Sequence, residues 1–340
     1  MKILENFSLK PYNTFHIDVS AKKFATFSTI DELQELLSSQ KSEKKKFILG
    51  GGSNILFTKD FDGLVLKNEI TGIDVVHEDM DYVYLRVGAG ENWHEFVKYC
   101  IAKDLAGVEN LSLIPGNVGA SPMQNIGAYG VEIKEVFESL SAFHIKDKKV
   151  IKFTLNDCKF GYRESVFKKK YKDQFVILDV IYRLNKRHQY NTSYGAIEEE
   201  LQKMGVKDLT IAAISQAVIN IRSSKLPNPD EIGNAGSFFK NPTLPIKQIV
   251  KLRESFPALE KSPTYPVDEF HAKIPAGWLI EQAGWKGYRQ GDAGCHAKQA
   301  LVLVNYGNAQ GSDIYFLSEA ILQSVKSKFG IELEREVNIV

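Results

Sequence analysis

Three glycine-rich segments in the first 130 residues limit most strongly what this chain can fold into. They read GGGSN at 50–54, GAG at 88–90 and PGNVGASPMQNIGAYG at 115–130. Each ends or begins a regular element, and successive glycines let backbone N–H groups converge on an anion without obstruction by side chains. Neither of the first two completes a dinucleotide motif, because Ile55 and Trp93 stand where the third glycine is needed. Singly, each segment is more typical of a structural turn; together they predict a dinucleotide cofactor bound without a Rossmann motif.

The hydrophobic pattern predicts an α+β chain of about two domains. Helices are expected at 31–40, 91–107, 246–256 and around 314–325, and strands at 46–57 (interrupted by the glycine turn), 82–90, 139–146, 174–184, 299–305 and 331–340. In the second helix Trp93, Phe96 and Cys100 form an apolar face, and Gly107 is expected just beyond the helix end. The segment 223–236, rich in Pro, Gly, Asn and Asp, is a candidate domain boundary.

Composition and charge argue against several classes of protein. The chain has 43 basic and 42 acidic residues, so no overall field favours nucleic acid or an anionic membrane. Its three cysteines lie far apart, which argues against a disulfide framework and for a reducing compartment, expected to be the cytoplasm. No signal peptide, apolar membrane span or metal-binding motif is recognised, so we expect neither a membrane span nor a metal.

The segment NAGSFFKNP at 234–242 combines residues that neither a surface turn nor a buried strand explains. Phe238 and Phe239 suit a core, whereas Ser237 and Asn241 do not. On this segment alone, the favoured interpretation is a turn leading into a core strand, with the serine hydroxyl bonded to nearby backbone.

In order along the chain, the motifs resemble those of one enzyme family. They are GGGSN, GAGENWH, PGNVGASPMQNIGAYGVE, GYRES, YGA, KLP followed by GNAGSFFKNP, AGWLIEQ and a terminal LEREV. Because so many occur together over nearly the whole chain, the sequence is similar to the UDP-N-acetylenolpyruvoylglucosamine reductases. The segment NTSYGAIEEE around Tyr194 resembles the substrate loop of the type I branch. The resemblance implies an FAD- and NADPH-dependent oxidoreductase that makes UDP-N-acetylmuramate for peptidoglycan synthesis, and so serves cell shape and division.

The resemblance also implies a fold and a division of the chain. The expected fold class is α+β, with an FAD-binding domain of the vanillyl-alcohol-oxidase/p-cresol-methylhydroxylase type and a smaller α+β substrate domain. The expected parts are two FAD-binding subdomains at 1–68 and 69–226, the second completed by 329–340, and a substrate-binding domain at 227–328. FAD is expected to be non-covalent and NADPH to be a co-substrate. The expected partner is a small-molecule nucleotide sugar, with no nucleic acid, and the protein is expected to be a monomer.

Candidate site residues carry over by motif. The catalytic ones are Arg163 of GYRES, Ser237 of GNAGSFF and Glu336, the second glutamate of LEREV. Cofactor contacts are implied for Gly50, Gly51, Gly52, Ser53 and Asn54 at the diphosphate and for Pro115, Gly116, Ser121, Gln124, Asn125, Gly127, Tyr129 and Gly130 along the flavin. Substrate contacts are implied for Tyr194, Lys225, Asn241, Tyr265, Lys273 and Gln299.

The chain departs from the family pattern at two positions near its C-terminus. Arg335 stands between the terminal glutamates, where the family often has proline, and Asn338 stands where it often has arginine. We therefore expect no flavin contact from Asn338. Because the tail beyond Glu336 is short, the ordering of Glu336 is expected to depend on the pairing of its strand.

The implied reaction explains why these residue types are needed. A hydride reaches the terminal carbon of an enolpyruvyl ether, and the neighbouring carbon then carries enolate charge spread onto the carboxylate. Arg163 can form paired hydrogen bonds with that carboxylate, and Glu336 can help if it is protonated when it meets the oxygen. Ser237 would donate the proton, with Gly236 leaving room for the substrate.

Two other functions remain compatible with the sequence. A flavin-linked oxidase of the same fold would release hydrogen peroxide at a rate comparable to turnover. Many such enzymes tether the flavin through His or Cys near the diphosphate loop, and residues 50–60 contain neither. A non-catalytic nucleotide-sugar-binding protein would bind substrate without flavin reduction, although the intact Arg163, Ser237 and Glu336 argue against it.

Overall fold

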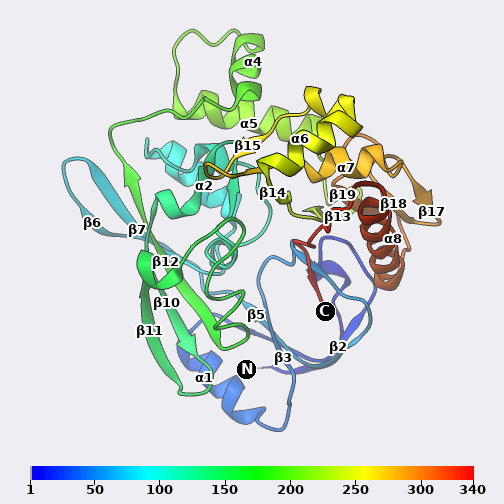
Figure 1. The fold of residues 1–340 in the computed structure, drawn as a ribbon. Coiled ribbons are helices and arrows are strands. Elements are labelled where there is room, and N and C mark those ends of the chain that lie inside the picture. The colour runs from blue at the N-terminus through cyan, green and yellow to red at the C-terminus, as the bar shows by residue number, and fades with distance from the viewer. Residues whose placement is uncertain (1) are drawn as a thin grey trace. The chain divides into compact units, whose positions relative to one another are not determined.

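The computed structural model describes residues 2–340 (Figure 1), and the chain forms two compact units. Unit 1 comprises Met1–Phe7, Ser20–Gly52 and Phe61–Ser224, and unit 2 comprises Ser8–Val19, Ser53–Asp60 and Lys225–Val340. The chain passes between the units inside the GGGSN loop and again at the end of residue 224, within the segment singled out as a boundary. The finer division into subdomains stays a prediction.

Unit 1 is built on two large sheets and a two-stranded one, in which β8 (Gly127–Ala128) pairs with β9 (Val131–Glu132). The first contains β1 (Leu4–Ser8), β2 (Ser20–Phe27), β3 (Lys46–Leu49) and β5 (Phe61–Asn68), in the order β1–β2–β5–β3 with parallel pairing from β2 to β3. The second is antiparallel and contains β6 (Ile73–Glu78), β7 (Tyr82–Gly88), β10 (Phe137–His144), β11 (Lys149–Thr154) and β12 (Phe175–Asn185), in the order β11–β10–β12–β7–β6. Alternation sets the buried face of β7, where Val83, Leu85 and Val87 are buried and Arg86 is exposed.

Within the described residues, five α-helices lie in unit 1 and bury apolar residues against its sheets or against one another. They are α1 (Ile30–Ser39), α2 (Trp93–Ala102), α3 (Leu155–Cys158), α4 (Gly195–Lys203) and α5 (Ile211–Lys225), the last ending at the first residue of unit 2. Asn92 caps α2, because its side-chain oxygen accepts the N–H groups of His94 and Glu95. Trp93 and Phe96 are buried in the larger core of the unit, as their spacing predicts.

The predicted end of the second helix is wrong. The helix ends at Ala102, with Lys103 as its cap, and Asp104 takes the left-handed conformation that follows (φ 57°). Gly107 does have a positive φ of 130°, but it lies farther along, in the turn after the helix. An aspartate tolerates the left-handed region, so the glycine is not needed to stop this helix.

Unit 2 contains short strands and three further helices. Its strands are β4 (Ile55–Leu56), β13 (Gly233–Ser237), β14 (Thr243–Pro245), β15 (Tyr265–Pro266), β16 (His271–Lys273), β17 (Arg289–Gln290), β18 (Ala293–Cys295), β19 (Val302–Asn305) and β20 (Asn338–Ile339). They form sheets of order β13–β19–β18–β17, β14–β16–β15 and β20–β4. The helices are α6 (Ile246–Ser255), α7 (Ala276–Gln282) and α8 (Gly311–Phe329). Phe238 and Phe239 are fully buried in this unit, which confirms that they anchor their segment in a core.

The terminal segment is less regular than the predicted strand at 331–340. Only β20 is a regular strand, and it pairs in parallel with β4. Farther upstream, Arg335 forms a single antiparallel bridge with Phe239. The segment is therefore held by two short pairings with different partners. Among the described residues, none of the helices combines the length and apolar character needed to span a lipid bilayer.

Candidate functional site

The parts of the three glycine-rich segments that belong to unit 1 lie close together. Asn117 donates its side-chain N–H to the carbonyl of Gly90 at 2.7 Å, and the N–H of Trp93 bonds the carbonyl of Gly116 at 2.9 Å. A Cβ placed on Gly51 would lie 2.6 Å from the Cα of Gly116, closer than real Cβ contacts come. The first two segments therefore each pack directly on the third, and we call the three together the glycine cradle.

Two polar side chains of the 115–130 segment are bonded inside unit 1. Ser121 and Tyr182 share a buried hydrogen bond of 2.6 Å between their hydroxyl groups. The amide of Asn125, in the left-handed region at φ 45°, donates to Glu132 and to the carbonyl of Gly161, and its oxygen accepts the N–H of residue 134. These two side chains shape the loop, so we expect contacts of this part of the loop with a ligand to come largely from backbone groups.

Arg163 lies in unit 1 against the second half of this loop. Its guanidinium donates to the carbonyl of Gly127 at 2.7 Å and lies over the ring of Tyr162, 5.5 Å from the centroid. Its backbone is in the left-handed region at φ 54°. Tyr129 and Tyr194, both implicated by the sequence, meet edge to face with ring centroids 5.3 Å apart. Unit 1 thus brings Arg163 near the loop, and the two tyrosines against each other.

Sequence reasoning missed a second arginine, Arg222 on α5. Burial lowers the pKa of Arg222, and the positive charge of Arg163 lowers it further. A hydrogen bond with the hydroxyl of Tyr129 raises this pKa. Two guanidinium groups that repel each other in a partly buried place favour an anion there. A signal was available, because Arg222 follows Val218 by one helical turn on the buried face of α5 and precedes Lys225 of the KLP motif.

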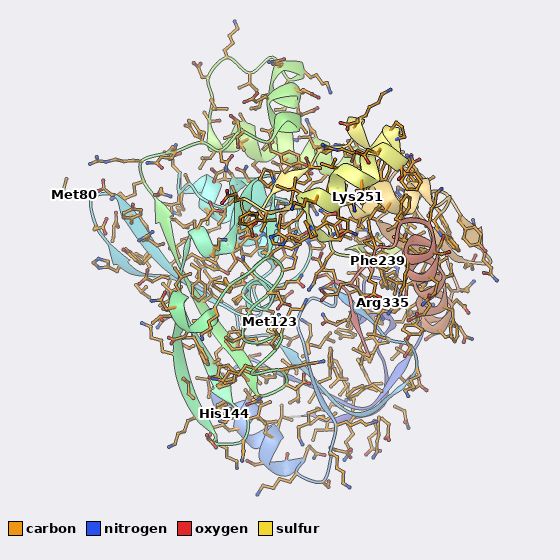
Figure 2. The ribbon with its side chains drawn as sticks, in the orientation of Figure 1. Met80, Met123, His144, Phe239, Lys251 and Arg335 are labelled. Carbon is orange, nitrogen blue, oxygen red and sulfur yellow. The ribbon has the colours of Figure 1, made fainter. Side chains whose placement is uncertain are left out.

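Unit 2 brings the segments of Ser237 and Glu336 together. The N–H of Glu336 bonds the carbonyl of Phe238 at 2.8 Å, and the N–H of Lys240 bonds the carbonyl of Glu334 at 2.8 Å. Figure 2 labels Phe239 and Arg335, the residues that face each other at the centre of this short ladder. Pairing therefore places the backbones of the two predicted catalytic residues in adjacent segments, although almost 100 positions separate them along the chain.

The backbone before Ser237 is shaped by glycine. Gly236 has φ 67°, and a Cβ placed on it would meet no atom within 4 Å. The side-chain oxygen of Asn234 accepts its N–H at 3.0 Å. Space is therefore open beside Ser237, which is half-buried at the end of β13.

Four of the predicted substrate contacts lie around α7 and the β14–β16–β15 sheet. Tyr265 and Lys273 stand directly opposite each other on β15 and β16. The side-chain oxygen of Asn241 accepts the first N–H of α7 at 2.9 Å. The side-chain oxygen of Gln299 also lies beside α7, 3.0 Å from the position that a Cβ on Gly277 would take. The other two lie elsewhere: Lys225 is the exposed last residue of α5, and Tyr194 belongs to unit 1.

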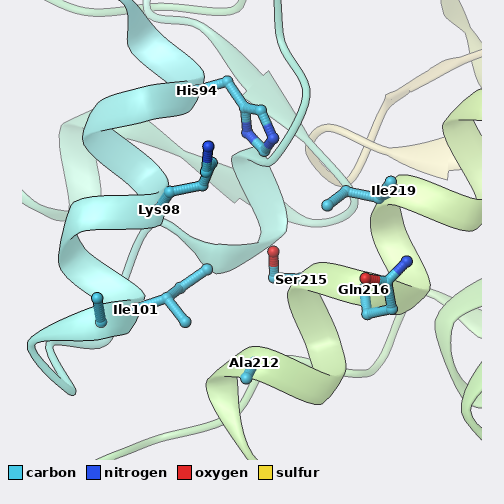
Figure 3. A pocket seen from close by; sticks show the side chains of 8 residues that line it. His94, Lys98, Ile101, Ala212, Ser215, Gln216 and Ile219 are labelled. Carbon is cyan, nitrogen blue, oxygen red and sulfur yellow. The ribbon is translucent and has the colours of Figure 1, made fainter.

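A groove of about 530 Å³ between α2 and α5 contains none of these residues (Figure 3). Its lining includes His94, Lys98 and Ser215, and the Ser215 hydroxyl bonds that of Ser112 at 2.8 Å. The N–H of Leu113 donates to Nδ1 of His94 at 3.0 Å, and burial lowers the pKa of this histidine. The groove therefore presents a neutral imidazole at pH 7.

Comparison with known proteins shows one family along the whole chain. The FAD binding domain profile matches residues 21–153, and that of the UDP-N-acetylenolpyruvoylglucosamine reductase C-terminal domain matches 228–340. The enzymes of that name from Flavobacterium johnsoniae and Amoebophilus asiaticus are 52% and 50% identical to the chain, each over 100% of both sequences.

Solved structures agree at the level of fold. UDP-N-acetylenolpyruvylglucosamine reductase from Thermus caldophilus superposes with a TM-score of 0.68 at 23% identity, over 99% of this chain and 98% of its own. p-Cresol methylhydroxylase reaches a TM-score of 0.50 at 9% identity, over 94% of this chain and 82% of its own. The predicted fold class, an FAD-binding domain joined to a smaller α+β domain, is confirmed.

Proposed function

The chain belongs to the UDP-N-acetylenolpyruvoylglucosamine reductase family, and we propose that it reduces UDP-N-acetylglucosamine enolpyruvate to UDP-N-acetylmuramate with NADPH and FAD. The observation that carries the proposal is the ladder between the segments of Ser237 and Glu336. It holds a hydroxyl donor and a carboxyl group on neighbouring backbones, beside the open space at Gly236.

The glycine cradle fits FAD. Its loops pack closely, and their glycines carry no side chains that would keep a diphosphate from the backbone amides. We assign the diphosphate to Gly50–Gly52 with the adjoining Ser53 and Asn54, and the flavin to the segment 115–130. When bound, FAD supplies the hydride chemistry, in which two electrons pass from NADPH to the enolpyruvyl methylene carbon.

Ser237 acts in this proposal as the proton donor to the carbon beside the carboxylate. An unactivated hydroxyl is a weak acid, but an enolate carbon is a strong base, so the transfer can run downhill. Positioned proton transfer is worth about 10²–10⁴ in rate. Gly236 supports the assignment, because no side chain there stands between the hydroxyl and an approaching substrate.

Arg163 and Glu336 act on the developing negative charge. A guanidinium carries five N–H donors in one plane, so Arg163 can bond the Gly127 carbonyl and also a carboxylate. Arg222 strengthens the preference for an anion near Arg163 through its own positive charge. Glu336 serves as a donor to the enolate oxygen when it is protonated.

The remaining polar residues bind the nucleotide sugar. Asn241, Lys273, Tyr265 and Gln299 lie close enough in unit 2 to contact one ligand. A lysine is a common partner for a diphosphate, which supports Lys273 and Lys225 in that role. Tyr194 adds a contact from the loop before α4.

An anaerobic titration tests the function. NADPH should bleach the visible absorbance of the flavin, and addition of UDP-N-acetylglucosamine enolpyruvate should restore it rapidly. Bleaching without recovery would retain a flavoprotein but remove the proposed substrate. Release of hydrogen peroxide in air at the rate of turnover would favour the oxidase instead, and a colourless protein that binds no added FAD would overturn the proposal.

Gly51→Ala is expected to lower FAD affinity at least about tenfold, because the new Cβ would meet backbone 2.6 Å away and push two loops of the cradle apart. The flavin-to-protein absorbance ratio after gel filtration measures the loss. Gly195→Ala is the matched control, since a Cβ at Gly195 meets nothing within 4 Å. Equal FAD content in the two variants would contradict the cradle.

A further inference from the structure

Arg335 lies on the core-facing side of the terminal segment. Ile331, Leu333 and Val337 are 2%, 8% and 4% exposed, whereas Glu334 is exposed. Successive side chains of an extended segment point to opposite sides, so Arg335 shares the side of the three apolar residues. A charged side chain in such a register needs specific partners.

Helix α8 provides those partners on one face. Nε of Arg335 donates to the hydroxyl of Ser318 at 2.9 Å, and Nη2 donates to the carboxylate of Glu319 at 2.6 Å. The guanidinium also lies over the ring of Tyr315, 4.8 Å from the centroid. Residues three and four apart on a helix share a face, so the planar group is bonded at its edge and covered by an aromatic ring. The bond from Arg335 lowers the pKa of Glu319, so this pair is charged at neutral pH.

The backbone around Glu336 is also attached to segments 238–240 and 54–58. Its N–H bonds Phe238, and the side chain of Asn54 donates to its carbonyl at 3.3 Å. Lys240 and Glu334 form an ion pair of 2.5 Å on the side opposite to Arg335. A ladder of this length is weak by itself. The contact of Arg335 with α8 adds two side-chain hydrogen bonds and an aromatic contact at the residue directly before Glu336.

We propose that Arg335 is a positioning residue, which fastens the terminal segment to α8 and so holds Glu336 where it meets the substrate. This role rests on the function proposed for Glu336. Arg335 stands opposite Phe239, and the ladder bonds are made by residues 334 and 336. The position thus makes no backbone bond in this ladder, and its side chain does the fastening.

Two variants break the contact from its two ends. Arg335→Met keeps a long side chain against Tyr315 but removes the hydrogen bonds, and Glu319→Gln changes only the half-exposed acceptor on α8. We expect Arg335→Met to slow reoxidation of the reduced enzyme by substrate by about 10- to 100-fold, as for a misplaced catalytic group. FAD content and reduction by NADPH should be unchanged. Amide hydrogen exchange in the peptide containing Glu336 should be faster, independently of activity.

Lys326→Met is the matched control. Lys326 forms a 2.6 Å ion pair with Glu332, which also joins α8 to the terminal segment, but it touches none of the partners of Arg335. It should leave both the rate and the exchange at Glu336 unchanged. The double variant Arg335→Met/Glu319→Gln should be reoxidised by substrate no more slowly than Arg335→Met alone, because the two substitutions remove the same contact.

The outcomes separate this role from the proposed function. Failure of substrate to reoxidise the wild-type enzyme overturns the function and this role with it. Normal wild-type reoxidation, with Arg335→Met and Glu319→Gln both at the wild-type rate, overturns the role of Arg335 alone. A loss of thermal stability without a slower reoxidation would show that the arginine is merely structural, and so would equal losses in both half-reactions.

Discussion

Ser237→Ala is expected to bind FAD and to be reduced by NADPH normally, but to be reoxidised by substrate about 10²–10⁴-fold more slowly than the wild type. The substitution removes one hydroxyl and leaves the backbone pairing of β13 with β19, including the 2.8 Å bond from the N–H of Phe238 to Leu301. Phe238 and Phe239 keep the segment in the core. The loss should therefore fall on proton donation alone, and stopped-flow absorbance measures the two half-reactions separately.

Two companion variants sharpen this result. Ser237→Cys retains an acidic proton at the same place, so it should be reoxidised faster than Ser237→Ala. Ser255→Ala removes an exposed hydroxyl at the end of α6 in the same unit and should behave as the wild type. Reoxidation of Ser237→Ala at the wild-type rate would mean that another group supplies the proton.

Local features of the chain were predictable because they depend on neighbours in sequence. The apolar face of α2 and the burial of Phe238 and Phe239 follow from spacing and residue type. The error at Gly107 has an equally local cause: Asp104 can also take the left-handed conformation, and nothing in the pattern ranks the two positions.

Features that depend on pairing across the chain were not predictable from spacing. The bridge between Phe239 and Arg335 joins segments that no periodicity relates, and β20 pairs with another partner, β4. The pairing of Arg222 with Tyr129 likewise joins a helix to a distant loop, which spacing along the chain does not indicate. The resemblance of the motifs identified Arg163, Ser237 and Glu336 as candidates. The positioning role of Arg335 follows instead from its contacts with α8, which only the structure provides.

Arg163→Lys is expected to lower kcat/KM for the enolpyruvyl substrate about 10²–10³-fold, although it keeps the positive charge. The guanidinium can bond the Gly127 carbonyl, 2.7 Å away, and still fork onto a carboxylate in the same plane. A lysine offers one compact ammonium, so bonding the carbonyl draws it away from the substrate. Both residues have a Cβ, so the left-handed backbone at φ 54° costs about the same in each.

The matched control for Arg163→Lys is Arg183→Lys. Arg183 also lies over a tyrosine ring in unit 1, 4.8 Å from the centroid of Tyr82, but it is exposed on β12. Loss of activity in both variants would point to general destabilisation by removing an arginine stacked on an aromatic ring. Loss in Arg163→Lys alone, with FAD content and reduction by NADPH retained, would place the defect at the substrate carboxylate. A fully active Arg163→Lys would mean that a positive charge at position 163 suffices without the planar geometry of a guanidinium. A lysine there would also preserve the repulsion between positions 163 and 222.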